Sequence, residues 1–185
     1  MDLLFLAKTR DSSQEMPLVF IRFLERSQDN RKEIRYLFLI TSLILLEDNG
    51  EQMDWKVKQQ ISSKVARIIL TDRDVHIRIK ALDGLRTLSE VNPLCILNNE
   101  LLDAMRNVCF TKKVNFRLNV YDIIADVYIN LMSVLSTDSF YIPKIGKLAG
   151  ILRICLTKAK SNEDEYNHLL IILYRIREFL LSLKK

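Results

Sequence analysis

Residues that bend or interrupt the backbone are scarce in this sequence. Its 185 residues include only four glycines and three prolines. This scarcity argues against a fold with many tight turns and leaves little material for a glycine-rich phosphate-binding loop. Leucine, isoleucine, lysine, arginine and glutamate are abundant, which favours helices over sheets. We therefore expect one all-α domain over residues 1–185, long enough to bury a continuous core.

Cysteine is rare as well. Cys95, Cys109 and Cys155 are an odd number of residues without close spacing. This pattern argues against a disulfide framework and against a zinc site. We predict buried free thiols in a protein of a reducing compartment.

Histidine is limited to His76 and His168, which lie far apart in the sequence. The chain contains no H-E-x-x-H motif, no nucleophile elbow and no phosphate-cradling loop. Asp122 and Asp126 are four residues apart on one predicted helix face, but lone acids at this spacing are commonly solvated. We therefore expect a chain that is not an enzyme and that takes no metal, no cofactor and no small-molecule substrate.

Long apolar runs are missing. The longest, over residues 36–46, contains Thr41 and Ser42 and is too short to span a bilayer. The N-terminal stretch M-D-L-L-F-L-A-K begins with an acid and reaches Lys8 too soon for a secretory signal. The sequence therefore predicts an intracellular protein, nuclear or cytoplasmic, with no membrane insertion.

Three similar stretches carry an arginine at the same place. Arg35, Arg78 and Arg117 each follow a polar turn and an apolar residue, and each precedes an amphipathic run. They are 43 and 39 residues apart. A period of about forty residues in a helical chain indicates stacked helix pairs.

The apolar periodicity predicts the helices of these pairs. A short helix is expected at 2–8, and the longer ones are expected at 16–27, 30–46, 52–70, 75–91, 97–110, 114–135, 142–157 and from 164 to the end. They combine into four antiparallel pairs at about 16–47, 52–91, 97–135 and 142–183. The connections are too short for a domain boundary, and stacking lets neighbouring pairs bury their apolar faces together.

The turn before each second helix carries a further pattern. Asp29 precedes Ile34-Arg35 by the same offset by which Asp72 precedes Ile77-Arg78. An acid in the turn, followed six residues later by an arginine after an aliphatic residue, resembles HEAT repeats. The third unit keeps Phe116-Arg117 but has Thr111 in place of the acid, and the fourth, at Tyr166-Asn167, shows no clear match.

The resemblance covers residues 16–135 and implies a right-handed superhelical α-solenoid of the armadillo-like type. It also implies a ladder in which turn acids and arginines of adjacent repeats pair, so that Asp29, Arg35, Asp72 and Arg78 are structural. Arg117, whose own turn lacks an acid, is predicted to take one from a neighbouring repeat or to face a ligand.

Basic residues form two candidate binding surfaces in a chain of net charge +5. The first group lies at the starts of the second helices and comprises Arg31, Lys32, Arg73, Lys80, Lys112, Lys113 and Arg117. The second lies on the helix over 144–160 and comprises Lys144, Lys147 and Arg153. Such residues can follow phosphates or an acidic peptide. They can equally be a solvated edge, because Glu33, Asp72 and Asp74 partly cancel their charge and no aromatic residues are interleaved.

The two ends of the chain are rich in apolar residues, although terminal repeats normally need a polar outer face. The residues concerned are Tyr166, Leu173, Tyr174, Leu180 and Leu181 near the C-terminus, and Leu3 and Phe5 near the N-terminus. They form either a protein-binding surface or segments that fold back on neighbouring repeats.

These patterns favour a non-catalytic scaffold or adaptor subunit that binds one or more proteins in an intracellular hetero-complex. The alternative is a helical-repeat module that binds nucleic acid through the second-helix edge and the 144–160 helix.

Overall fold

The computed structural model describes residues 18–47, 53–135 and 141–183. In these ranges all regular structure is helical, without a strand. The predicted helix at 2–8, with Leu3 and Phe5, lies outside the described residues. The α-helices are α2 (Leu18–Glu25), α3 (Lys32–Glu47), α4 (Trp55–Thr71), α5 (Val75–Val91), α6 (Pro93–Ile96), α7 (Asn99–Val108), α8 (Val114–Leu135), α9 (Ile142–Lys158) and α10 (Glu163–Ser182), with 3₁₀ turns η1 (Arg26–Gln28) and η2 (Ala159–Ser161).

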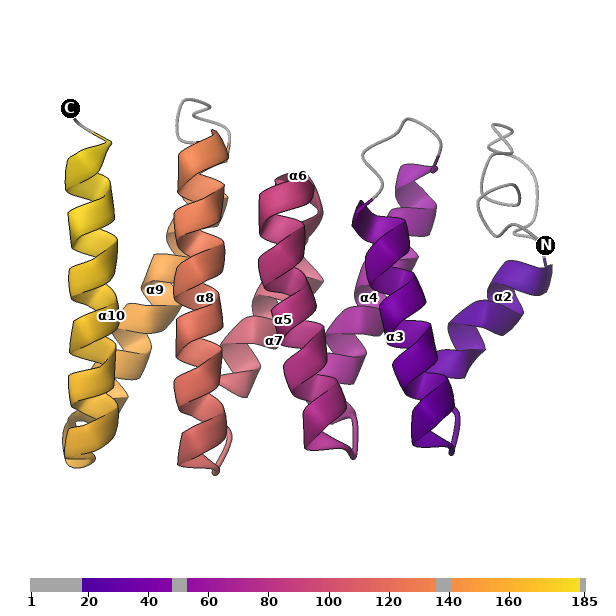
Figure 1. Ribbon diagram of the computed structural model, residues 1–185, viewed down its shortest axis with the longest axis horizontal. Coiled ribbons are helices and arrows are strands. Elements are labelled where there is room, and N and C mark those ends of the chain that lie inside the picture. Colours follow the sequence, from indigo (N-terminus) through magenta and orange to yellow (C-terminus); the bar gives the residue numbers. More distant parts are fainter. Residues whose placement is uncertain (1–17, 48–52, 136–140, 184–185) are drawn as a thin grey trace.

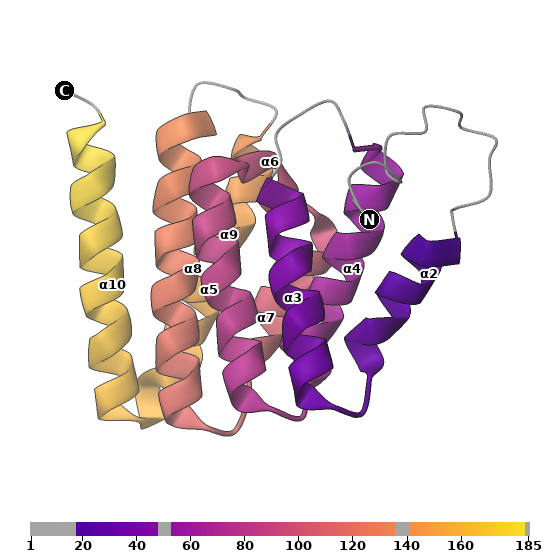
Figure 2. The ribbon, with the colours of Figure 1, turned by 45° about the vertical axis from the view of Figure 1, so that its right-hand side comes forward.

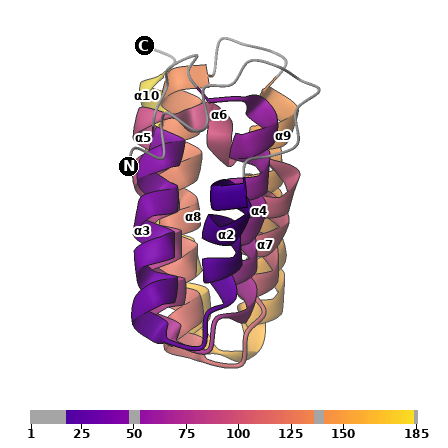
Figure 3. The same cartoon turned by 90° about the vertical axis from the view of Figure 1, so that its right-hand side faces the viewer.

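The long helices lie in two rows. Figure 1 shows α3, α5, α8 and α10 side by side in one row, and Figure 3, an end-on view, shows α2, α4, α7 and α9 in the other. In the first row α5 packs between α3 and α8, and α8 packs between α5 and α10. In the second row α7 packs against α4 and α9. Elements adjacent in sequence are therefore adjacent in space, and α2 and α10 lie at opposite ends of the molecule (Figure 2).

Side-chain caps fix where several helices begin. The carboxylates of Asp54 and Asp74 accept hydrogen bonds from the backbone N–H groups of Lys56 and His76, at 2.7 and 2.8 Å. Asn162 caps α10 in the same way. Such caps satisfy N–H groups that have no partner inside the helix. The N-terminal ends of α3, α5, α8 and α10 lie along one edge of the molecule, the lower edge in Figure 1.

One boundary differs from the sequence prediction. The helix predicted over 97–110 corresponds to α7, and a separate short helix, α6, precedes it at 93–96, where the sequence predicted no helix. Pro93 stands in the first turn of α6, where its missing N–H costs nothing. The side chain of Asn98 accepts a hydrogen bond from the Glu100 N–H at 2.8 Å and starts a new helix. A hydrogen bond joins the end of α5 to the end of α3: the Asn92 side chain donates to the carbonyl oxygen of Leu46 at 2.8 Å.

The core runs continuously between the two rows. Leucine, isoleucine and valine side chains from every long helix from α3 to α10 contribute to it, together with the three cysteines, which are buried and free as predicted. α3 and α5 approach closely at Gly84, where a Cβ atom would collide with the Leu43 side chain. Two large apolar side chains lie outside this core: Leu37 is 62% exposed and Trp55 is 59% exposed. Leu37 points away from the side of α3 that carries Leu39 and Leu46.

Candidate functional site

An arginine–carboxylate bond joins the first two helix pairs. Arg35 Nε donates to Asp72 Oδ2 at 2.7 Å and its Nη2 donates to Oδ1 at 3.0 Å. Its Nη1 donates to the carbonyl oxygens of Asp29 and Asn30 in the turn before α3. Arg35 is only 7% exposed. The predicted pairing of Arg35 with Asp72 is present, and we call such a contact between successive pairs an inter-pair bridge.

A second inter-pair bridge joins the last two pairs. Arg117 Nε donates to Glu165 Oε1 at 2.8 Å, and its Nη2 donates to Oε2 at 2.5 Å. The Tyr121 hydroxyl donates to the same carboxylate at 2.6 Å, and Arg117 Nη1 donates to the Thr111 carbonyl oxygen. Hydrogen bonds from Arg117 lower the pKa of Glu165 and outweigh the opposing effect of burial. Arg117 therefore takes its acid from the following pair, and its assignment to the exposed basic surface is wrong.

Arg78, between these two bridges, has no such partner. Within the described ranges no carboxylate lies within 4.0 Å of its guanidinium nitrogens. Its Nε donates to the carbonyl oxygen of Ile69 at 2.8 Å, and its guanidinium carbon lies 4.8 Å from the centre of the Phe116 ring. Burial lowers the pKa of Arg78. Thr111 stands where the acid is needed, and its buried hydroxyl oxygen has no hydrogen-bond partner. The predicted ladder contact of Arg78 is therefore not formed.

Replacing Thr111 by aspartate is expected to add the missing inter-pair bridge. The new carboxylate would bond Arg78 as Asp72 bonds Arg35, and would raise the unfolding free energy by about 1–2 kcal/mol. Urea denaturation at pH 7 measures the change, with Thr111→Asn as the uncharged control of the same shape. Equal stability of the two variants would contradict the expectation.

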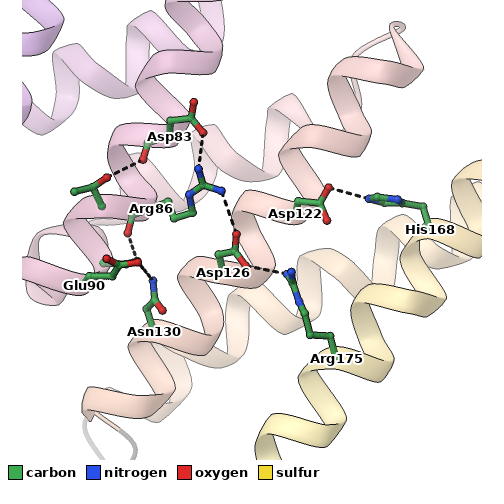
Figure 4. Close-up of polar contacts among 10 residues, drawn as sticks. Asp83, Arg86, Glu90, Asp122, Asp126, Asn130, His168 and Arg175 are labelled. Carbon is green, nitrogen blue, oxygen red and sulfur yellow. Dashed lines mark hydrogen bonds and ion pairs between the residues drawn. The ribbon is translucent and has the colours of Figure 1, made fainter.

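A polar network crosses the exposed side of three helices (Figure 4). Asp126 on α8 lies between two arginines. Its Oδ2 is 3.3 Å from Arg86 Nη1 on α5, and its Oδ1 is 3.0 Å from Arg175 Nη2 on α10. Arg86 also contacts Asp83 on its own helix at 3.2 Å. These contacts run from one pair to the next, parallel to the buried inter-pair bridges.

The same network continues on either side of Asp126. His168 Nε2 on α10 is 3.0 Å from Asp122 Oδ2 on α8, and Asn130 Nδ2 donates to the Ser89 hydroxyl at 2.9 Å. Asp122 and Asp126 are therefore not lone acids, because both contact basic side chains of neighbouring helices, although the Asp122 side chain is still 40% exposed. In the sequence, each of these acids is separated from its basic partner by about one repeat, and that spacing is the pattern that indicates the contacts.

The predicted basic residues do not form one surface. Six of them are exposed near the starts of α3, α5 and α8, where Asp29, Glu33 and Asp74 lie among them: Arg31, Lys32, Arg73, Lys80, Lys112 and Lys113. Lys144, Lys147 and Arg153 lie on α9, in the other row. Lys147 Nζ donates to Asn99 Oδ1 at 3.2 Å, and Lys144 is partly buried.

Two of the predicted protein-binding residues near the C-terminus are exposed. Tyr174 is 61% exposed and Leu181 is 44% exposed. The others, Tyr166, Leu173 and Leu180, are half-buried and pack against the core, so their assignment to an open surface is wrong. Leu170 and Ile171 on the same helix are also exposed, at 42% and 68%. Their signal is a second apolar face on α10, opposite the core face.

One side of α10 is exposed where the equivalent sides of α3, α5 and α8 are buried. The eighth and eleventh residues of α3, α5 and α8 face the following helix pair and are at most 2% exposed: Leu39, Ser42, Leu82, Leu85, Tyr121 and Ile124. The same positions of α10 are Leu170, which is exposed, and Leu173, which is half-buried. The side of α10 that corresponds to an internal interface is thus uncovered by any described residue.

None of the described helices is long and apolar enough to cross a membrane. In the same residues, no three His, Cys, Asp or Glu side chains are close enough together to hold a metal ion. No protein-family model matches the sequence, and a comparison with curated proteins finds no match.

Proposed function

We propose that the chain is a HEAT-like, right-handed superhelical solenoid that acts as a non-catalytic scaffold or adaptor in an intracellular complex. The open apolar face of α10 carries this proposal. Leu170, Ile171, Tyr174 and Leu181 are exposed there, on a helix whose equivalents α5 and α8 are covered by the next pair. Apolar surface of this kind typically marks a protein-binding site.

The inter-pair bridges support the same proposal. A buried two-bond contact between an arginine and a carboxylate fixes both the distance and the angle between the groups that carry them. Arg35 therefore fixes the orientation of the second pair on the first, and Arg117 fixes that of the fourth on the third. Between the second and third pairs, Arg86 contacts Asp126 at 3.3 Å. A scaffold needs this stiffness, because its partners must be held in a defined geometry.

The experiment is purification of the tagged chain from its native cell, with identification of the proteins that accompany it. Leu170→Asp and Tyr174→Asp are expected to reduce capture of those proteins at least tenfold, because each places a charge in an apolar contact. Leu37→Asp, at an equally exposed apolar position on α3, is the control. Circular dichroism confirms that each variant is folded. Equal capture by all three variants would contradict the proposed role of α10.

The nucleic-acid alternative rests on the exposed lysines at the start of α8. Binding of this kind depends steeply on salt, because lysine–phosphate contacts release counterions. Fluorescence anisotropy with a labelled oligonucleotide, at low and high salt, compares the chain with its Lys112→Glu/Lys113→Glu variant. If the chain is a scaffold, wild type should bind the oligonucleotide weakly, and the variant should capture partner proteins as wild type does. Tight, salt-sensitive binding that the variant loses would favour the alternative.

A further inference from the structure

Four side chains form a stripe along the open side of α10. Leu170, Tyr174, Arg177 and Leu181 are all exposed, and their spacings are four, three and four residues. Leu170 and Arg177 are seven residues apart, as are Tyr174 and Leu181, and a seven-residue repeat lets two helices stay in contact along their length. The stripe therefore has the pattern of a short helix–helix interface, but no described helix lies against it.

The stripe is complementary to itself when a second copy runs in the opposite direction. Reversing the order four–three–four gives the same spacing, so Leu170 of one copy lies opposite Leu181 of the other, and Tyr174 lies opposite Arg177. The leucines form apolar contacts at both ends. A guanidinium over a tyrosine ring is favourable, and the arrangement provides two such contacts related by two-fold symmetry.

A second copy fits this face better than a further helix pair of the internal kind. At two of the three internal junctions a carboxylate lies against the fourth residue of the preceding second helix, as Asp72 does at Arg35 and Glu165 does at Arg117. α10 has Tyr166 at its fourth position and so lacks that arginine. It carries Arg177 instead, at the position where α3 and α5 have the buried residues Leu46 and Ser89. Arg177 contacts Glu178 of its own helix at 3.7 Å and remains exposed. The Tyr174 ring of a second copy would offer its guanidinium a further favourable contact.

We propose that two copies of the chain associate through α10, antiparallel and about a two-fold axis, with the 170/174/177/181 stripe at the centre of the interface. This rests on the proposed role of the α10 face as a protein-binding surface and names its occupant. The dimer would place the two stacks end to end, with the α2/α3 pair of each copy at the outer ends.

Sedimentation equilibrium of the full chain tests the association. The chain mass is 21.7 kDa, and wild type is expected to approach twice that value at about 100 µM, as a dimer with a dissociation constant of about 1 µM would. Tyr174→Asp should weaken the dimer at least tenfold, whereas Leu37→Asp should leave it unchanged. A wild-type chain that stays monomeric at that concentration would overturn the proposal.

Disulfide trapping tests the antiparallel register. A mixture of the Leu170→Cys and Leu181→Cys variants, treated with diamide, should give a covalent dimer containing one chain of each. Either variant alone should give little, because its two new thiols would be about 16 Å apart along the helices. The native cysteines are buried and provide a low background. Equal trapping of each variant alone would overturn the antiparallel arrangement.

The two proposals fail in different ways. If wild type is monomeric but Tyr174→Asp still loses captured proteins, the scaffold function stands and self-association is overturned. If the chain dimerises through the stripe but captures no other protein, the dimer stands and the hetero-complex is overturned.

Discussion

Replacing Glu165 by alanine is expected to lower the unfolding free energy by about 3–5 kcal/mol. The substitution leaves the guanidinium of Arg117 largely buried without a counter-charge, since only 18% of that side chain is exposed. It also removes the acceptor of the Tyr121 hydroxyl, whose remaining contact, with the Cys109 carbonyl oxygen, is longer at 3.4 Å. Urea denaturation at pH 7 measures the loss.

The control for this prediction is Glu163→Ala, in the same helical turn but exposed. It should cost no more than about 1 kcal/mol, because it loses only the favourable position of an acid near a helix N-terminus. Equal losses in the two variants would mean that Glu165 does not bond Arg117 in solution.

Replacing Asp72 by alanine should have an effect of similar size, about 3 kcal/mol. The Asp72 carboxylate accepts two hydrogen bonds from Arg35 and one from the backbone N–H of Asp74. Its side chain is 1% exposed, so the variant buries Arg35 without a counter-charge. The control is Asp83→Ala, which removes a partly exposed surface contact with Arg86 and should cost less than about 1 kcal/mol. Similar losses in both variants would contradict the assignment of Asp72 to an inter-pair bridge.

The stabilisation by Asp72 should also depend on pH. Burial by itself raises the pKa of this carboxyl, but hydrogen bonds from Arg35 and from the Asp74 N–H outweigh it, and the net pKa is lowered from 3.8. A lowered pKa in the folded state means that the contribution is fully present above the unfolded value and is lost as pH falls through the folded value. The difference between wild type and Asp72→Ala should therefore be constant near neutral pH and shrink below about pH 4.

The inter-pair bridges show what the sequence can predict and where it fails. Arg35 and Asp72 follow from the turn pattern, because Asp72 repeats the place of Asp29 in the next turn and Arg35 follows Asp29 by the offset at which Arg78 follows Asp72. The bridge runs from an arginine to the acid of the following pair. Because Thr111 is not an acid, Arg78 of the preceding pair has no carboxylate partner. In the sequence pattern, by contrast, the missing acid belongs to the same unit as Arg117.

Glu165 was not predictable from the turn pattern. Asp72 lies three residues before α5, whereas Glu165 is the third residue of α10. Its longer side chain reaches Arg117 from inside the helix, and only the packing of α8 on α10 reveals this. The contacts of Asp126 depend in the same way on how far each helix is rotated about its axis.

The outer face of α10 was predicted only in part. Its apolar residues occur on more than one side of the helix, so periodicity alone does not separate those that face the core from those that face outward. Leu173 and Leu180 pack inward, whereas Leu170 and Tyr174 point outward. Only the positions of α8 and α9 distinguish the two sets.

A double-mutant cycle on Arg117 and Glu165 tests most directly whether buried arginine–carboxylate bonds join successive helix pairs. Arg117→Met, Glu165→Gln and the double variant are compared by urea denaturation. A direct bond predicts a coupling energy of about 2 kcal/mol, while Arg35→Met combined with Glu165→Gln should be additive within about 0.5 kcal/mol. A coupling energy below about 0.5 kcal/mol between Arg117 and Glu165 would contradict the bridge.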